Sequence, residues 1–175
     1  MPQTYLRPLR QEDAADIFGI IDTQREYLGR WLPFVAATRS VADSQAYVAS
    51  VTESTSENSD KVFAIICDDS FAGIVGIKSI DLANRKAEIG YWLSEPFQGR
   101  GLITEAVSRL CRLAFDDMAL NRIQISCAVG NMRSSNVAKR LGFTFEGIER
   151  AGEFAGGKEY FDIEIYSLLR SEYKR

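Results

Sequence analysis

The stretch "EIGYWLSEPFQGRGLITEA" at residues 88–106 decides what fold the rest of the chain can have. Its first half is rich in β-branched and aromatic residues and predicts a strand that ends at Leu93. After a Gly-Arg-Gly turn at 99–101, hydrophobic periodicity predicts a helix from Gly101 to Asp116. A helix that starts at such a turn presents free backbone N–H groups, which suit an anion.

The segments on either side alternate between helical and strand patterns. Periodicity predicts helices at 11–21, 26–32 (ended by Pro33), 41–53 and 134–141, and strands at 4–8, 61–67, 71–77, 85–93, 122–129, 143–149 and 159–169. Residues 55–60 are expected to form a loop, and Gly156-Gly157 a turn. No repeat or linker divides the chain, so residues 1–175 are expected to form a single domain. Its fold class is α/β (α+β), with a mixed, mostly antiparallel sheet of about six or seven strands and helices on both faces.

Composition narrows the chemistry that the chain can perform. Of its 175 residues, 46% are hydrophobic, the formal net charge is −3, and none is histidine. The lack of histidine excludes Ser-His-Asp triads and Cys-His pairs, so acid–base catalysis must depend on carboxylates, Tyr, Lys, Cys, hydroxyls or water. Cys67, Cys111 and Cys127 are far apart in the sequence and form no CxxC pair. We expect reduced, buried thiols and no metal.

The same totals bear on location and partners. The net charge is acidic and no basic stripe is present, so no nucleic-acid partner is expected. No apolar run reaches the roughly 18 residues of a membrane-spanning helix, and the polar start at 1–10 has no signal-peptide pattern. We therefore expect a cytoplasmic protein without membrane association.

Three kinds of phosphate-binding loop compete for the glycine turn. No segment fits the Walker pattern G-x-x-x-x-G-K-[ST]. The dinucleotide pattern G-x-G-x-x-G matches Gly99 and Gly101, but its third glycine is replaced by Thr104. The turn also does not begin the first βαβ unit of the chain, where that pattern normally occurs. The third pattern, Q/R-x-x-G-x-G/A, matches residues 98–103 in its first four positions and departs from them at Ile103. A glycine turn that serves only chain reversal is the simpler alternative.

Further segments occur in a recognisable order around this loop. They are "LRPLRQEDAADIF" at 6–18, "REYLGRWLPF" at 25–34, "KAEIGYWLSEPFQGRG" at 86–101, "GNMRSSNVAKRLGF" at 130–143 with its N-x-x-S, and "YFDIEIYSLL" at 160–169. Together they resemble the GNAT superfamily of N-acetyltransferases, and in detail the RimJ/RimL branch, which acetylates N-terminal amines of ribosomal proteins. The resemblance implies a GNAT-type domain with a splayed central strand, and acetyl-CoA as cosubstrate without a metal.

The resemblance also implies which residues bind acetyl-CoA. Backbone amides of the loop would hold the diphosphate, with a charged contact from Arg100. Tyr91, Trp92 and Leu93 would offer backbone groups to the pantetheine arm, and Asn131 would bond to it. Lys139 and Arg140 would meet the 3′-phosphate or remain solvated. The expected cofactor-binding residues are Trp92, Leu93, Gln98, Gly99, Arg100, Gly101, Leu102, Ile103, Asn131, Ser134 and Lys139.

The implied reaction is direct attack of a neutral amine on acetyl-CoA, and three residues are candidates for catalysis. Glu88 is the first candidate for the base, unless it only pairs with a Lys or Arg. Glu153 is the second, unless it is an exposed loop charge. Ser134 would protonate or hydrogen-bond the departing thiolate, unless it caps a helix. A backbone N–H near Leu93 would hold the oxyanion.

The acceptor side is less defined by the sequence. Trp31 and Phe34 map to the wall of the acceptor site, although core packing explains either one alone. Tyr160 and Asp162 match the terminal motif; Tyr160 is expected to contact the acceptor with Trp31 and Phe34, and Asp162 is expected to organise the loop. The favoured acceptor is the N-terminal α-amine of a protein, and the resemblance implies a ribosomal protein. The alternatives are acetylation of a small amine (polyamine, amino acid or aminoglycoside) and a CoA-binding module without turnover. A homodimer or higher homo-oligomer is expected, and the β-rich C-terminal end is the candidate interface.

Overall fold

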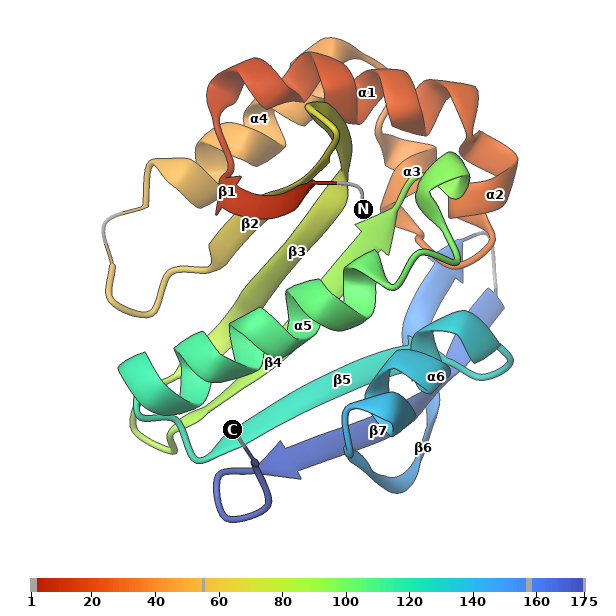
Figure 1. Cartoon of the computed structure of the whole chain (residues 1–175). Coiled ribbons are helices and arrows are strands. Elements are labelled where there is room, and N and C mark those ends of the chain that lie inside the picture. The colour runs from red at the N-terminus through yellow and green to blue at the C-terminus, as the bar shows by residue number, and fades with distance from the viewer. Residues whose placement is uncertain (1–2, 55, 157–158, 175) are drawn as a thin grey trace.

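A computed structural model describes residues 3–54, 56–156 and 159–174, so Thr55 in the expected loop and Gly157 in the expected turn lie outside the described residues. In chain order (Figure 1) the elements are β1 (Thr4–Pro8), η1 (Gln11–Asp13), α1 (Ala14–Thr23), α2 (Arg25–Gly29), α3 (Phe34–Ala37), α4 (Val41–Thr52), β2 (Lys61–Cys67), β3 (Ser70–Asp81), β4 (Lys86–Leu93), η2 (Glu95–Phe97), α5 (Leu102–Arg112), η3 (Leu113–Asp117), β5 (Arg122–Ala128), α6 (Met132–Arg140), β6 (Thr144–Gly156) and β7 (Glu159–Leu169).

All seven described strands join one sheet in the order β1-β2-β3-β4-β5-β7-β6. Within the described residues, β4 and β5 pair in parallel and the other neighbours pair antiparallel. The predicted mixed, mostly antiparallel sheet is therefore confirmed. The parallel pair needs a crossover, which α5 provides between β4 and β5.

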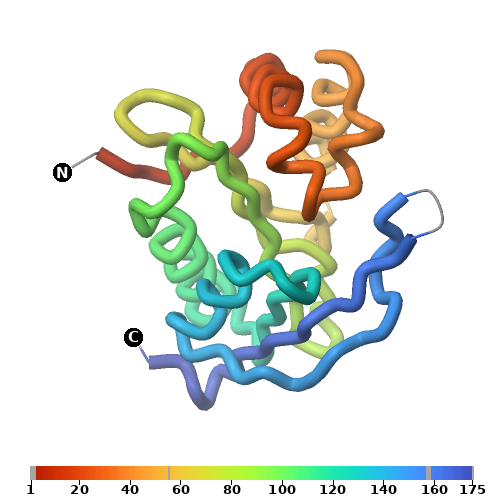
Figure 2. Tube along the Cα trace, turned by 90° about the vertical axis from the view of Figure 1, so that its right-hand side faces the viewer, coloured from red at the N-terminus to blue at the C-terminus, as the bar shows by residue number. Residues whose placement is uncertain are grey.

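Helices cover both faces of this sheet, as predicted, because its strands are apolar on both sides. Along β2, Ala64 and Ile66 join the core beneath α1 and α4, whereas Ile65 and Cys67 join the core beneath α5. Figure 2 shows the N-terminal helices and α5 on opposite sides of the sheet. No helix of the described residues is long and apolar enough to cross a bilayer.

The central strands separate at one end. Pairing between β4 and β5 covers Lys86 with Arg122, Ala87 with Ile123 and Glu88 with Gln124, and stops there. Beyond Glu88, β4 continues to Leu93 and remains paired with β3. The two strands therefore diverge in a V whose apex is Glu88 (Figure 1), and the far half of β4 has an open edge.

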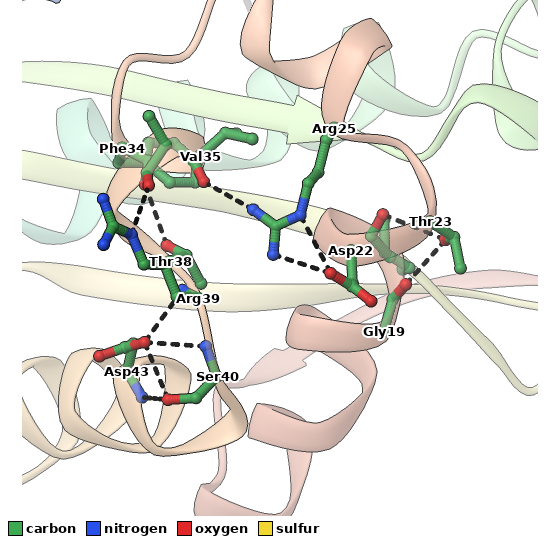
Figure 3. A network of polar contacts seen from close by, with 12 residues as sticks. Gly19, Asp22, Thr23, Arg25, Phe34, Val35, Thr38, Arg39, Ser40 and Asp43 are labelled. Carbon is green, nitrogen blue, oxygen red and sulfur yellow. Dashed lines mark hydrogen bonds and ion pairs between the residues drawn. The ribbon is translucent and has the colours of Figure 1, made fainter.

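Polar contacts join the helices on the face opposite α5, as Figure 3 shows. The Arg25 guanidinium donates to Asp22 at 3.0 and 2.8 Å and to the Val35 carbonyl at 3.1 Å, so it links α1, α2 and α3. Ser40 caps α4: its side-chain oxygen accepts from the Asp43 amide at 3.3 Å, and the Asp43 carboxylate accepts from the Ser40 amide at 2.8 Å in return. These helices are thereby fixed relative to one another.

Several boundaries differ from the predicted ones. The short helix expected at 26–32 ends at Gly29, and α3 follows it, which was not predicted. Helix α6 starts at Met132 instead of Ser134, because Asn131 caps it. Strand β6 continues past Glu149 to Gly156, because register shifts absorb the residues that the pattern assigned to a loop.

Candidate active site

A cavity of about 780 Å³ lies beside the glycine turn, and we name it the loop cavity. Its walls come from α2, the open end of β4, the first turn of α5 and helix α6. The expected cofactor-binding residues that line it are Trp92, Leu93, Gln98, Gly99, Gly101, Leu102, Ile103, Asn131 and Ser134. Residues that are far apart in the sequence are thus brought to one hollow.

Backbone geometry at the turn explains its glycines. Gly99 and Gly101 have φ values of +73° and +79°, which L-residues rarely adopt, and Gly101 is the N-cap of α5. A Cβ at either position would meet no atom within 4 Å, so both face open space. The first amides of α5 have no partner inside the helix and carry its positive dipole end. By contrast, the Gln98 amide already donates to the Glu95 carbonyl at 3.1 Å.

Ile103, which departs from the loop pattern, has a packing role. Its side chain is half-buried and packs against the core cluster that includes Leu102 and Ala106 of α5. Ile103 also lines the loop cavity. A branched side chain is therefore accepted at this position because the core accommodates much of it.

The positive charge at the loop cavity comes from Arg133 and Arg140, which both line it. Arg133 donates to the Gln98 side-chain oxygen, and the sequence offered no signal for this contact. Arg100 instead donates to the Pro96 carbonyl at 3.0 Å and lies over the ring of Phe97. Arg100 is absent from the cavity lining.

Lys139 also turns away from the loop cavity. Its ammonium lies 5.9 Å from the ring centroid of Tyr166, whose side chain belongs to the core. The neighbouring Arg140 faces the cavity. Of the two basic residues considered for the 3′-phosphate, the structure therefore brings Arg140 to the site and leaves Lys139 outside its lining.

A second cavity, of about 630 Å³, lies on the other side of the open end of β4, and we name it the strand-face cavity. Its walls include Trp31, Phe34, Glu88 and Glu153, which were expected at the acceptor side or as bases. The residues that line both cavities are Trp31, Leu32, Tyr91, Trp92, Asn131 and Ser134. The two cavities therefore meet in the opening between β4 and β5.

Tyr160, expected at the acceptor site, lies outside both cavities. Its side chain is 59% exposed and packs edge-on against Phe154, with ring centroids 5.3 Å apart. It lines neither the loop cavity nor the strand-face cavity. Asp162, from the same motif, accepts a hydrogen bond from the amide of Ala151 at 2.7 Å, where φ is +51°. Asp162 thus organises the backbone of β6, which is the role expected of it.

Ser134 stands at the junction of the two cavities. Its hydroxyl oxygen lies 3.0 Å from the Tyr91 hydroxyl, and its amide donates to the Asn131 side-chain oxygen at 3.3 Å. Asn131 is therefore the N-cap of α6, and the alternative in which Ser134 caps the helix is wrong. The Ser134 side chain remains available to the site.

The two candidate bases lie close to one another. Glu88 pairs with Lys78 across β3 and β4 at 3.3 Å, so the ion pair considered as its alternative role does form. Glu153 is exposed, as its alternative role required, but it lies on β6 and not in a loop. Desolvation by the surrounding protein raises its pKa; the positive charge of Lys78 opposes the rise and the negative charge of Glu88 adds to it. The three side chains form one charged cluster at the wall of the strand-face cavity.

Gln24 links the helices to the end of β4, and sequence patterns gave no sign of it. Its side-chain nitrogen donates to the Ser94 hydroxyl at 2.8 Å, and its side-chain oxygen accepts from the Glu95 amide at 2.9 Å. Ser94 follows directly after Leu93 and is buried. The junction of α1 and α2 is therefore held against the backbone that leads into the glycine turn.

The thiols offer no nucleophile at this site. Cys67, Cys111 and Cys127 are buried and free, and Cys127 lines the strand-face cavity. Burial and the negative charge of Glu164 raise the pKa of Cys127 to about 11, so its thiol is neutral at pH 7. Within the described ranges, no group of three or more Cys, Asp or Glu side chains is arranged to hold a metal ion.

The geometry fits acetyl-CoA: an anion-binding helix start, basic side chains beside it and an open strand edge leading inward. The family described as "Acetyltransferase (GNAT) domain" matches residues 3–144. The putative ribosomal N-acetyltransferase YdaF of Bacillus subtilis is 35% identical over 171 residues, which cover 97% of this chain and 92% of the relative.

Two further proteins widen the comparison. The spermidine N(1)-acetyltransferase of Escherichia coli is 27% identical, covering 96% of this chain and 87% of the relative. A solved structure of RimL, a ribosomal L7/L12 alpha-N-protein acetyltransferase in complex with coenzyme A, has a TM-score of 0.89 and 26% identity, covering 95% of this chain and 93% of that chain. The resemblance seen in the sequence is thereby confirmed: this chain belongs to the GNAT family and is an N-acetyltransferase that uses acetyl-CoA.

Proposed function

We propose that this enzyme acetylates the N-terminal α-amine of a protein, and that a ribosomal protein is the first acceptor to test. The observation that carries the proposal is the meeting of two cavities at Tyr91 and Ser134. The loop cavity suits the cosubstrate, and the strand-face cavity leaves a separate approach for the acceptor. RimL is described as a ribosomal L7/L12 alpha-N-protein acetyltransferase and YdaF as a putative ribosomal N-acetyltransferase, which supports this choice of acceptor.

The cosubstrate would be held along its whole length. Its diphosphate lies at the first amides of α5, where the helix dipole favours negative charge, with Arg133 and Arg140 beside it. Its pantetheine arm follows the open edge of β4 and bonds to backbone groups at 91–93. The acetyl group then reaches the opening between β4 and β5, next to Ser134.

The chemistry proceeds by direct attack. The neutral amine nitrogen bonds to the acetyl carbon, while a backbone N–H near Leu93 stabilises the developing oxyanion by about 3 kcal/mol. The carbon–sulfur bond then breaks, and the sulfur leaves with the electron pair and accepts a hydrogen bond from Ser134. The surplus proton of the nitrogen passes to Glu88 or Glu153, directly or through water, and a proton from solvent completes the CoA thiol.

Charge at the strand-face cavity favours a cationic acceptor. Its lining holds one lysine, Lys78, and five carboxylates: Asp43, Asp60, Glu88, Glu149 and Glu153. A protonated amine is drawn into such a cavity before it is deprotonated. An α-amine has a pKa of about 8 against about 10.4 for lysine, so a weak base suffices to make it neutral.

The same charge supports a second candidate acceptor, a polyamine. A polyamine carries several positive charges that the carboxylates would pair with, and a spermidine acetyltransferase is among the relatives. A thiol-release assay separates the two candidates. Peptides that begin with Ser or Ala are compared with spermidine, with free amino acids and with the same peptides blocked at the α-amine. CoA release from unblocked peptides alone supports the proposal, whereas release with spermidine alone contradicts it.

We further propose that the enzyme works in the cytoplasm as a homodimer. Strand β6 is one of the two outer strands of the described sheet and exposes Phe145, Ile148 and Phe154, each more than half accessible. A long edge strand with exposed apolar side chains favours pairing with a second copy. Light scattering on the intact protein tests this: a monomer at micromolar concentration contradicts it, and Phe154→Asp should shift a dimer toward monomer.

A further inference from the structure

Tyr91 makes a contact across the opening between the splayed strands. It lies on β4 where pairing with β5 has ended, yet its hydroxyl reaches helix α6. The phenol has one proton, which it can donate to the Ser134 carbonyl oxygen at 3.2 Å or to the Ser134 hydroxyl oxygen at 3.0 Å. One phenol therefore lies within hydrogen-bonding reach of both the backbone and the side chain of Ser134 at the junction of the two cavities.

We propose that Tyr91 is a positioning residue that fixes the Ser134 hydroxyl toward the departing sulfur of CoA. This inference rests on the proposed role of Ser134 in acetyl transfer. When the phenol donates its proton to the serine oxygen, the serine's own proton is left to be donated to the sulfur at the junction of the two cavities. A hydrogen bond received at the serine oxygen also polarises that O–H, which strengthens the bond it gives to the thiolate.

The surroundings of Tyr91 support this role. Burial raises the pKa of Tyr91 well above its ordinary value, although the hydrogen bond to Ser134 opposes the shift, so the phenol keeps its proton throughout turnover. The Cys127 thiol is also within hydrogen-bonding reach of Ser134, but it is neutral at pH 7, and a neutral sulfur is a weaker acceptor for the serine's proton than a thiolate. The Asn131 side-chain oxygen accepts from the Ser134 amide, so the serine has hydrogen-bond partners for both its backbone and its side chain.

The variant Tyr91→Phe tests the inference because it removes the hydroxyl and keeps the ring. Loss of one hydrogen bond in the transition state should lower kcat about 3- to 10-fold. The KM for acetyl-CoA should stay within about twofold, because the phenol is not proposed to touch the cofactor. Tyr5→Phe is the matched control, since Tyr5 lies on β1 and lines neither cavity.

A double-mutant cycle separates positioning from general structural support. If Tyr91 acts through Ser134, then Tyr91→Phe should not lower kcat further in a Ser134→Ala background. A full additional loss in the double variant, or unchanged kcat in Tyr91→Phe, would overturn the inference. Tyr91→Leu repeats the comparison should the phenylalanine variant melt early.

The outcomes also separate this inference from the proposed function. Wild-type protein that releases no CoA with any amine overturns the proposed function and this inference with it. An active wild type with a fully active Tyr91→Phe variant overturns the inference alone. The assay uses acetyl-CoA and the best acceptor found among the peptides and polyamines.

Discussion

The glycine turn offers a paired comparison that separates cofactor binding from fold stability. Gly101 and Gly142 both have a φ of +79°, and a Cβ at either would meet no atom within 4 Å. Gly101 lines the loop cavity, whereas Gly142 follows the end of α6 and lines neither cavity. Alanine at each position therefore carries the same backbone cost, but only the methyl group at Gly101 projects toward the proposed diphosphate site.

The expected magnitudes follow from this geometry. An L-residue in the left-handed region costs about 1 to 2 kcal/mol, which lowers the Tm of a domain of this size by about 2 to 8 °C in both variants. Acetyl-CoA at 100 times its Kd stabilises the wild type by about 2.7 kcal/mol. If the Gly101 methyl group raises the Kd tenfold, the same concentration stabilises that variant by only about 1.4 kcal/mol.

Thermal melting with and without acetyl-CoA measures both effects in one experiment. Gly142→Ala should lose stability and keep the full ligand-induced rise in Tm. Gly101→Ala should lose similar stability and show about half of that rise or less. The reasoning is refuted if Gly101→Ala keeps the whole ligand-induced rise, or if Gly142→Ala loses as much of it as Gly101→Ala does.

Three further predictions concern charged residues. Arg133→Ala should raise the Kd for acetyl-CoA at least about tenfold. Arg100→Ala should change the Kd less, because Arg133 lines the loop cavity and Arg100 does not; titration calorimetry that finds equal losses contradicts this. Glu88→Gln should lower kcat about 100-fold at unchanged Kd; an unchanged kcat would move the base to Glu153 or water. The third prediction concerns the buried carboxylate of Asp13. Desolvation opposes its ionisation, but hydrogen bonds from the Arg7 guanidinium and the Arg10 amide outweigh desolvation and lower the pKa of Asp13. Its stabilisation is present above pH 3.8 and is lost as the pH falls through that lower pKa, so acid unfolding of Asp13→Asn should depend less on pH in this range.

The cofactor loop could be predicted from the sequence because its signals are local. A strand pattern, two glycines and a helical periodicity all fall within residues 88–106, and the structure places them as β4, the turn and α5. The contact of Arg133 with Gln98 could not be predicted in this way. It joins residues 35 positions apart and depends on how α6 packs beside the turn.

The rotation of α6 and the bulges of β6 account for two other differences between the predicted and the observed structure. Lys139 and Arg140 are adjacent in the sequence, and the rotation of α6 about its axis decides that Arg140 faces the loop cavity. Successive helical residues point about 100° apart, so composition alone does not choose between them. The extension of β6 was missed because bulges let charged and glycine residues continue a strand that periodicity had ended at Glu149.

The Tyr91–Ser134 contact also could not be predicted from the sequence. It joins residues 43 positions apart across an opening that exists only because β4 and β5 stop pairing after Glu88. A hydrophobic pattern assigns Tyr91 to a strand but does not report which helix its hydroxyl meets. The junction of the two cavities is therefore a property of the fold and not of any one motif.

The most direct test of the account is mass spectrometry of a peptide that begins with Ser and carries one internal lysine. The peptide is incubated with the wild-type enzyme and acetyl-CoA, and fragment ions locate the added acetyl group. Acetyl transfer between the two cavities to an N-terminal acceptor predicts a single acetyl group on the α-amine. An acetyl group found only on the lysine side chain, or no acetylated peptide while spermidine is acetylated, would contradict the account.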